Sequence, residues 1–579
     1  MTLWPPSQIP AGPTRSLYTM MLAIFLLSLC AVTNALATQP QRLLGESLPA
    51  AQGSLEYSED AFDEADLAES DASDVNSWSW ETPAQTLQDL LGALNVMQDK
   101  YFCLWLGTWP TSIDWTAAVL GTHVGAALSS FTSSYNFDAE QPHNVSFAGL
   151  ENTVNQFFSQ LNTFYFGENA FALRNQAYDD MLWVVLDWLE NIKFQDLHTG
   201  LHYASSNASS LSTESKWYGT QFRDSAAHRA RIFYELASVG WDKTLCDGGM
   251  IWNPSLTPYK NAITNELYIS ASIAMYLYFP GDPIDAPFLT TNQDPASGLH
   301  NPIHLKAAVD GYKWLRNSNM TGIHGLYADG FHISGWRSSS NPGTRKCDVL
   351  NKMVFTYNQG VVLSGLRGLW LATGSQDYLR DGHELIHKVL RATGWPRTSS
   401  AQWAGLGRGG VLEDTCDSHS SCSQDGQTFK GIFFHHLAEF CRPLRPQEER
   451  FLAGETPRPA VDGEWEQVFR RHLSRCRAYG PWIEHNARAA LMTRDDEGKF
   501  GMWWGLPFSS ALAEGLADSS TLPEGAVDYR NGEMDVGAMT AGVPRDFNDR
   551  GRGRTVETQS GGVAVLRALF QWQTSDALS

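Results

Sequence analysis

The feature that most constrains the fold of this chain is a regular alternation between two kinds of helical segment. One kind is apolar on nearly every face, as in residues 181–192, 263–279 and 361–371. A helix that is apolar on all faces has to be buried on all faces. The other kind, as in residues 223–236 and 378–390, carries charges on one face and apolar side chains on the opposite face. That pattern is typical of helices on the outside of a protein.

Six segments are of the buried kind, and amphipathic segments lie between successive members. We expect the buried helices to begin near Trp115, Asp179, Asn261, Asn358, Lys430 and Glu557. An inner ring of six buried helices inside six outer helices satisfies this alternation, so the predicted fold class is all-α, an (α/α)6 barrel. A plain helix bundle is the alternative, but each of its helices would show a single apolar stripe.

The N-terminus resembles a secretion signal. Arg15 precedes an apolar run over residues 17–32, and residues 35–37 (Ala-Leu-Ala) fit the small-x-small pattern that signal peptidase cleaves. We therefore predict that residues 1–37 are a signal peptide. An uncleaved membrane anchor is the alternative, but the apolar run is short for a full membrane span.

An acidic segment separates the predicted signal from the helical region. Nine Asp and Glu residues lie between residues 56 and 74, with few apolar residues among them. Such a segment cannot bury enough apolar surface to offset the entropy lost on ordering. We predict that residues 38–81 form a disordered leader, either a solvated linker or a pro-segment, and that residues 82–579 form the catalytic (α/α)6 domain.

Charge and composition exclude several kinds of partner. The formal net charge of −21 argues against nucleic acids and anionic membranes, because both need a basic protein surface. The C-terminus lacks the hydrophobic tail of a GPI signal, and sequons at Asn144, Asn207 and Asn319 suit a glycosylated protein. We expect a monomer secreted to the extracellular or cell-wall space, with no membrane contact after signal cleavage.

Seven cysteines remain after signal cleavage, because Cys30 lies in the signal. An odd number leaves at least one thiol free or paired with another chain. Cys416 and Cys422 flank a short loop rich in Asp and Ser and are the favoured disulfide, while the pairing of the others stays open. The adjacent His435 and His436 would diverge by about 100° on a helix. We therefore expect no metal site and no cofactor.

Polar and aromatic residues open several of the buried helices. These clusters are Tyr178-Asp179-Asp180, Tyr259-Lys260-Asn261 with Asn265-Glu266 one turn later, Tyr357-Asn358-Gln359, and Glu557-Thr558-Gln559. Inner helices of an alternating barrel run parallel, so their N-termini should meet at one end of the ring. That end would form a polar pocket lined by Trp and Tyr, which suits an uncharged sugar.

Asp179 and Asp180 are the main candidates for catalysis. Glycoside hydrolysis usually needs two carboxyl groups, one ionised and one protonated. The positive end of a helix favours the ionised form, while two close carboxylates push their pKa values apart. The structural alternative is that Asp in a first helical turn only caps the helix. The same alternative holds for the Asn residues, and Lys260 with Glu266 could be a simple ion pair.

Five ordered stretches add a family resemblance. Residues 178–194, 248–278, 356–370, 429–440 and 554–570 resemble glycoside hydrolase family 76, whose members include endo-α-1,6-mannanases with an (α/α)6 fold. The resemblance implies a retaining enzyme in which Asp179 is the nucleophile and Asp180 the acid/base. It also implies that α-mannan is bound by Tyr178, Trp252, Asn253, Asn261, Asn265, Tyr357, Asn358 and Gln359.

Two parts of the chain do not match that family, and two other functions compete with hydrolysis. The unmatched parts are the acidic leader and residues 442–463. One competing function is a cell-wall transglycosylase that acts on mannoprotein or GPI-linked mannan and needs the same two Asp residues. The other is a non-catalytic mannan-binding protein, against which the intact Asp pair argues because a lectin needs no matched acid and nucleophile.

Overall fold

The computed structural model describes residues 82–134, 147–167, 176–203, 217–285, 299–454, 465–508, 522–531 and 546–577. The predicted signal peptide and acidic leader lie outside the described residues, as do the sequons at Asn144 and Asn207. Asn319 is exposed, which is compatible with glycosylation. In the described part of the chain, no helix combines the length and apolarity needed to cross a membrane.

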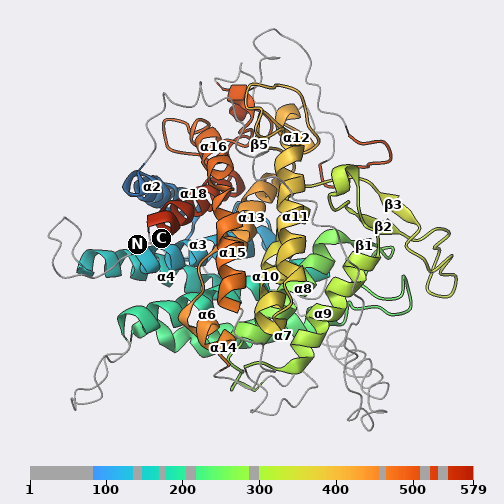
Figure 1. Cartoon of the computed structure of the whole chain (residues 1–579), viewed down its shortest axis with the longest axis horizontal. Helices are drawn as coiled ribbons and strands as arrows, with labels where there is room; N and C mark the ends of the chain where they lie inside the picture. The colour runs from blue at the N-terminus through green and yellow to red at the C-terminus, as the bar shows by residue number, and fades with distance from the viewer. Residues whose placement is uncertain are drawn as a thin grey trace, which may run out of the picture. The chain divides into compact units, whose positions relative to one another are not determined.

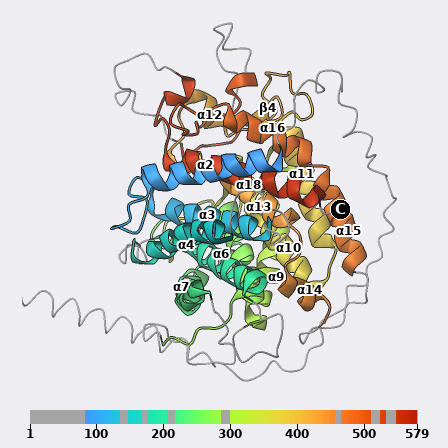
Figure 2. The same ribbon diagram turned by 90° about the vertical axis from the view of Figure 1, so that its left-hand side faces the viewer.

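Six helices pack in a closed cycle. They are α3 (Asp114–Ser134), α6 (Tyr178–His202), α8 (Ala262–Tyr278), α10 (Val361–Thr373), α13 (Gln424–Cys441) and α18 (Val556–Ala577). Each helix contacts the next in this order, and α18 returns to contact α3. All six contain long runs of buried residues, so the six buried segments predicted from the sequence are confirmed as helices (Figures 1 and 2).

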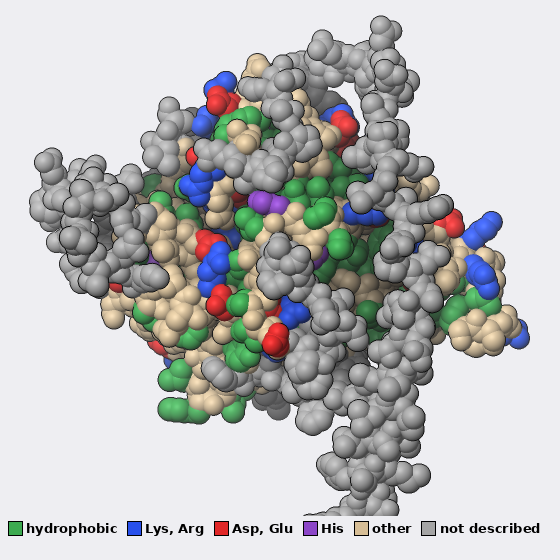
Figure 3. Space-filling view, turned by 90° about the horizontal axis from the view of Figure 1, so that it is seen from below, with side chains coloured by type: hydrophobic (Ala, Val, Ile, Leu, Met, Phe, Trp, Pro, Cys, Tyr) green, Lys and Arg blue, Asp and Glu red, His purple; other side chains and the backbone are tan. Residues whose placement is uncertain are grey.

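Amphipathic helices cover the outside of this cycle. They are α2 (Pro83–Tyr101), α4 (Phe147–Gly167), α7 (Arg223–Ser238), α9 (Pro302–Asn317), α11 (Asp377–Ala392), α15 (Trp465–Arg477) and α16 (Gly480–Leu491). Helix α4 packs on α3, α7 on α6, α9 on α8 and α11 on α10, while α2 and α16 both pack on α18. The face in Figure 3 carries acidic and basic side chains next to each other among apolar ones.

Local sequence signals explain where several helices begin. Thr82 accepts a hydrogen bond from the Gln85 N–H, and proline follows it at the first helical position of α2. Asn301 caps α9 in the same way, because it accepts a hydrogen bond from the Ile303 N–H and is followed by proline. Helix α13 begins at Gln424, six residues before the predicted start at Lys430, because the Ser423 hydroxyl caps it. Helix α10 begins at Val361 rather than near Asn358, since a short 3-10 turn precedes it.

The remaining elements are short. The strands β1 (Lys260–Asn261), β2 (Gly330–His332) and β3 (Val349–Asn351) form one antiparallel sheet in that order, and β4 (Gly407–Arg408) pairs with β5 (Val411–Leu412). The short helices are η3 (Tyr218–Phe222), η4 (Ile323–Gly325), η5 (Tyr357–Gln359), α12 (Thr415–His419), α14 (Pro446–Leu452), η6 (Leu506–Phe508) and η8 (Phe547–Asp549). Both sheets lie in segments that precede inner helices.

The closed cycle depends on glycines where inner helices approach closely. A Cβ at Gly431 in α13 would lie 2.9 Å from the Cα of Gly561 in α18. We expect Gly431→Ala to lower the free energy of unfolding by about 1 to 3 kcal/mol, because backbone atoms cannot move aside as a flexible side chain can. Denaturant unfolding monitored by circular dichroism would measure this change.

Gly92 in α2 provides the matched control for that substitution. A Cβ at Gly92 meets no atom within 4 Å. We expect Gly92→Ala to raise stability by up to about 1 kcal/mol, because alanine is the better helix former. If the two variants had equal stabilities, helix proximity at Gly431 would not limit the packing.

Buried ion pairs lie at the end of the ring opposite α12. Glu448 in α14 contacts Arg367 of α10 at 3.3 Å, and its other oxygen accepts a hydrogen bond from Arg442 at 2.9 Å. The hydroxyl of Tyr278, the last residue of α8, also donates to Glu448. In both ribbon views α14 and α12 lie on opposite sides of the molecule (Figures 1 and 2). The described residues of the segment 442–463 therefore link the inner helices α8 and α10.

Three disulfides link the described cysteines. Cys416–Cys422 forms as predicted, and the other two are Cys246–Cys347 and Cys441–Cys476. Cys103 is free, which agrees with the odd number of mature cysteines. The disulfide between Cys441, the last residue of α13, and Cys476 ties an inner helix to the outer helix α15.

Candidate active site

The two predicted carboxyl groups lie in the first turn of α6. The N–H of Tyr178, the first residue of the helix, donates to the Trp252 carbonyl at 2.8 Å and fixes where the helix begins. Asp179 is 3% exposed, whereas Asp180 is only partly buried. The backbone N–H of Asp180 donates to Asp179 Oδ1 at 3.1 Å. The two carboxyl groups therefore share a helix end but differ in their exposure.

In the described part of the chain, one cation, Arg530, lies beside Asp179. Arg530 Nη2 is 3.7 Å from Asp179 Oδ2, and the same guanidinium lies 5.2 Å from the centre of the Trp252 ring. Burial raises the pKa of Asp179 to about 6, and Arg530 opposes this rise. The pKa of Asp180 is raised well above its usual value by burial and by the charge of Asp179. Asp179 is therefore the more acidic of the two.

The N-termini of other inner helices meet close to this pair. Trp115 at the start of α3 donates to Asp425 of α13 at 2.7 Å, and it stacks on Trp183 of α6 at 5.6 Å. Glu557 of α18 accepts hydrogen bonds from Thr116 at 2.8 Å and from Gln424 at 2.9 Å. The starts of α3, α13 and α18 are thus connected directly, as expected if the inner helices run parallel.

Comparison with known proteins points to the same family. The pattern of Glycosyl hydrolase family 76 matches residues 226–452. This central part of the chain therefore resembles glycosyl hydrolase family 76. The matched segment runs from α7 to α14 and begins after α6, so the Asp pair lies outside it. It includes residues 442–452, so the expectation that residues 442–463 do not match the family is wrong for that part.

Two yeast proteins are also similar to part of the chain. The mannan endo-1,6-alpha-mannosidase DCW1 of Candida glabrata is 25% identical over 213 residues, which is 35% of this chain and 37% of that protein. The protein of the same name from Saccharomyces cerevisiae is 24% identical over 217 residues, or 36% of this chain and 38% of its own length. The match thus covers less than two fifths of each relative.

Solved structures also align with the chain. The GH76A alpha-1,6-mannanase from Salegentibacter sp. HEL1_6 aligns with a TM-score of 0.47 and 16% identity, covering 84% of this chain and 98% of that one. Dfg5 from Chaetomium thermophilum, in complex with glucosamine, aligns with a TM-score of 0.48 and 14% identity over 86% and 92% of the two chains.

Some of the residues predicted to bind substrate have buried polar atoms without a hydrogen-bond partner among the described residues. Trp252 lies against Arg530, and its side chain interacts with Asp179 and lowers the pKa of that carboxyl. Its indole N–H makes no other hydrogen bond among the described residues. The Tyr357 hydroxyl, both amide atoms of Asn358 and Asn261 Oδ1 have no hydrogen-bond partner there. The Tyr357 ring stacks on Phe429 at 3.9 Å, which fixes its hydroxyl.

Other predicted residues use their polar groups within the fold. The Asn265 amide bonds the backbone of Met250 and Asn261, and the Gln359 amide bonds the backbone of Tyr327 and Phe355. Asn253 accepts from the Ser255 N–H in a turn. Tyr178 packs against Gly240, where a Cβ would lie 2.5 Å from the Tyr178 ring. For these four residues, a role in the fold explains the hydrogen bonds and the packing that the structure shows.

Sequence reasoning missed three groups near the pair. Arg530 and Asp425 have been described, and Asp329 accepts hydrogen bonds from Tyr259 at 2.6 Å and from Asn351 at 3.2 Å. Asp425 would have been found had the capping Ser423 been recognised as the start of α13. Arg530 lies in a polar stretch with no helical period, so no sequence signal points to it.

Two clusters bring potential metal ligands together. His383, His472 and Cys476 form one cluster, and Cys416, Asp417 and Cys422 form the other, with ligand atoms within 4.8 Å of one another. The cysteines of both clusters are in disulfides, so they cannot bind a metal as thiolates. We therefore assign both clusters to the fold.

The suggested ion pair between Lys260 and Glu266 does not form. The Lys260 ammonium donates to the backbone carbonyls of Asp242, Leu245, Gly248 and Gly249. Glu266 is fully buried in α8, and neither of its carboxyl oxygens has a hydrogen-bond partner among the described residues. Burial raises the pKa of Glu266 well above its usual value.

Glu266 should make the stability of the fold depend on pH. A carboxyl whose pKa is higher in the folded state stabilises below the unfolded pKa of about 4.3, and this contribution is lost as pH rises. Glutamine does not titrate, so the stability of Glu266→Gln should not fall in this way as pH rises. We therefore expect the free energy of unfolding of the variant, relative to that of the parent, to increase by at most about 1.4 kcal/mol per pH unit from pH 5 to 7. Urea unfolding at several pH values would measure it, and a constant difference would contradict it.

Proposed function

We propose that this chain hydrolyses α-1,6-mannosidic bonds in mannan by a retaining double displacement. The observation that carries the proposal is the asymmetry of the Asp pair. Asp179 is buried beside Arg530, while Asp180 is more exposed and lacks a cation within 4 Å in the described structure. Such asymmetry suits a pair in which one carboxyl is ionised and the other protonated. The match to family 76 supports a glycoside hydrolase.

The proposed mechanism assigns one role to each carboxyl group. The Asp179 carboxylate attacks the anomeric carbon of a mannose, the bond to the leaving O6 breaks, and Asp180 gives its proton to that oxygen. Asp180 then takes a proton from water, which attacks the same carbon and releases the sugar from Asp179. A retaining pair needs its carboxyl groups about 5 to 5.5 Å apart. The positive end of α6 favours the ionised nucleophile.

The proposal includes the architecture and the location that the sequence predicted. We infer that the closed cycle of six helices and its outer cover form an (α/α)6 barrel, with the Asp pair at the end where the inner helices begin. Trp252, Tyr357, Asn358 and Asn261 would bind sugar hydroxyls, and the last three have buried polar atoms without a partner among the described residues. Secretion to the cell-wall space, suggested by the predicted signal, would bring the enzyme to mannan.

The test is reducing-sugar release from unbranched α-1,6-mannan by the mature chain, with an α-1,4-glucan as the control substrate. Release from mannan alone would support the proposal. Transfer to an added sugar acceptor, in place of new reducing ends, would replace hydrolysis by transglycosylation. Mannan binding with neither product would indicate a binding protein and overturn the proposed reaction.

A further inference from the structure

A short segment far along the chain brings Arg530 to the Asp pair. Residues 522–531 are held at one side by Asn351, whose amide exchanges two hydrogen bonds of 2.8 Å with the backbone of Val527. At the other side, the Asn531 side chain accepts from the Ser423 N–H at 2.8 Å and from its hydroxyl at 3.0 Å. We call this segment the strap. Arg530 is thus fixed by contacts immediately beside it.

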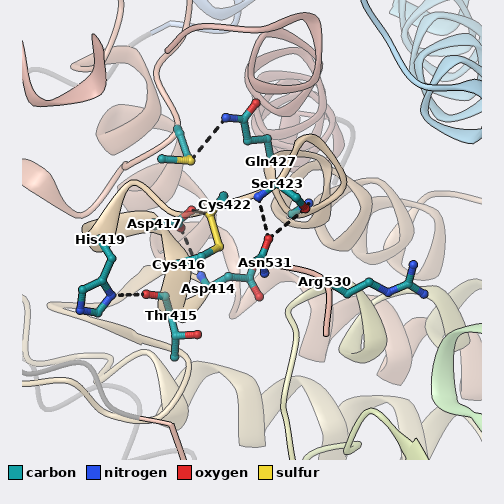
Figure 4. The surroundings of a disulfide bond; sticks show 12 residues. Asp414, Thr415, Cys416, Asp417, His419, Cys422, Ser423, Gln427, Arg530 and Asn531 are labelled. Carbon is teal, nitrogen blue, oxygen red and sulfur yellow. Dashed lines mark hydrogen bonds between the residues drawn. A yellow bond between two sulfur atoms is a disulfide. The ribbon is translucent and has the colours of Figure 1, made fainter. Parts of the chain in front are cut away.

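The Ser423 side of this attachment is itself rigid. Ser423 follows Cys422, whose disulfide with Cys416 closes the loop after α12. Asp417, between the two cysteines, pairs with Lys430 of α13 at 2.6 Å. Figure 4 shows Asn531 bonded to Ser423 next to the disulfide, with the Arg530 side chain extending away from it. The disulfide therefore supports the attachment of the strap.

Arg530 has donors to spare at this position. Its one ion pair in the described structure is the contact of 3.7 Å with Asp179 Oδ2, and no hydrogen bond of its guanidinium is seen there. The side chain is 21% exposed and lies over Trp252. A guanidinium carries five N–H donors, so it can strengthen its contact with Asp179 once substrate excludes water.

We propose that Arg530 is a positioning residue that keeps Asp179 ionised and oriented for attack, and that the Asn531–Ser423 attachment places it. This inference rests on the proposed hydrolysis. It explains how two adjacent carboxyl groups take opposite protonation states, because Arg530 contacts Asp179 and not Asp180. A cation within about 4 to 6 Å lowers the pKa of a carboxyl group by roughly 1 to 3 units.

Other charged and titratable groups face this contact. Asp180 lies next to Asp179 on α6, and Asp425, Asp329 and Tyr357 approach from α13, from the residue before β2 and from η5. The charges of Asp179 and Asp425 raise the pKa of Asp180, and Asp425 and Asp329 attract Arg530. Arg530 is the cation that offsets them in the described site. Removing it should therefore make Asp179 harder to ionise.

The experiment compares pH profiles of kcat/KM on unbranched α-1,6-mannan for the parent, Arg530→Met and Arg530→Lys. We expect the acidic limb to move to higher pH by about 1 to 3 units in Arg530→Met, because the nucleophile loses its cation. Arg530→Lys keeps the charge and should keep the limb close to that of the parent. A purely structural role would lower activity at every pH and leave the limb unmoved.

Two further variants keep the test decisive. Asn531→Ala keeps the Arg530 side chain but removes the attachment of the strap to Ser423. The acidic limb of its pH profile should therefore move to higher pH by a smaller amount than in Arg530→Met. Arg337→Met removes an exposed cation from the segment between α9 and α10, and should leave the profile unchanged. Thermal unfolding of each variant would confirm that it folds.

The outcomes separate this inference from the proposed function. No activity in the parent would overturn the proposed hydrolysis. An active parent whose profile coincides with those of Arg530→Met and Asn531→Ala would overturn the role of Arg530 alone. A limb that moves equally in the Met and Lys variants would also overturn it, since lysine retains the positive charge.

Discussion

Asp179→Asn and Asp180→Asn should each lower kcat on unbranched α-1,6-mannan by about a thousandfold or more. In the proposed mechanism each variant loses a group that acts in the transition state, and a thousandfold loss corresponds to about 4 kcal/mol of transition-state stabilisation. The two roles can be told apart with an aryl mannoside. Its leaving group needs little protonation, so Asp180→Asn should regain activity on it while Asp179→Asn should not.

Asp187 supplies the matched control on the same helix. It is buried, neither of its carboxyl oxygens has a hydrogen-bond partner among the described residues, and burial raises its pKa well above the usual value. Asp187→Asn therefore replaces a neutral acid by a group of similar shape and should retain turnover. If Asp179→Asn and Asp180→Asn kept full activity, the two residues would have only a structural role at the start of α6.

Glu448→Ala should be the most destabilising single change at the opposite end of the ring. It would leave Arg367 and Arg442 buried without the carboxylate that both contact. Breaking a buried pair in this way costs about 3 to 5 kcal/mol, because an uncompensated charge remains in the interior. Equilibrium unfolding in guanidinium chloride would measure this loss of stability. The slope of the free energy of unfolding against denaturant concentration should be the same in the variant and the parent.

The neighbouring residue is the control for this change. Glu449 is exposed in the same helix, so Glu449→Ala should alter stability by less than about 0.5 kcal/mol. Equal stabilities of the two variants would show that the charges at this end of the ring do not hold α8, α10 and α14 together. Glu448→Ala should also weaken the attachment of α14 first, which hydrogen exchange would detect.

Much of the helical framework could be predicted because burial leaves a periodic trace in the sequence. The buried segments after Asp179, Asn261 and Glu557 are apolar on all faces and begin within a residue or so of the predicted positions. The start of α13 was placed too late, because the polar residues from Ser423 to Thr428 hide its first turn. The strands were not predicted, since elements of two or three residues carry no period.

The candidate site was predictable only where its parts are adjacent in the chain. Asp179 and Asp180 are neighbours, so their pairing is visible in the sequence. Arg530 reaches Asp179 from the strap, a contact that depends on the attachment of Asn531 to Ser423. Likewise, Cys416–Cys422 spans a short loop and was predicted, while Cys246–Cys347, with a sequence separation of 101, was not.

The ion pairs around Glu448 have a consequence for how specificity can evolve in this chain. They fix α8, α10 and α14 at one end of the ring, where a change of charge endangers the fold. The segments that precede the inner helices, such as residues 102–113 and 318–356, contain many exposed residues. Sequence changes that alter the preference for substrate length or branching should therefore accumulate in those segments. The end of the ring that contains α14 should tolerate few substitutions.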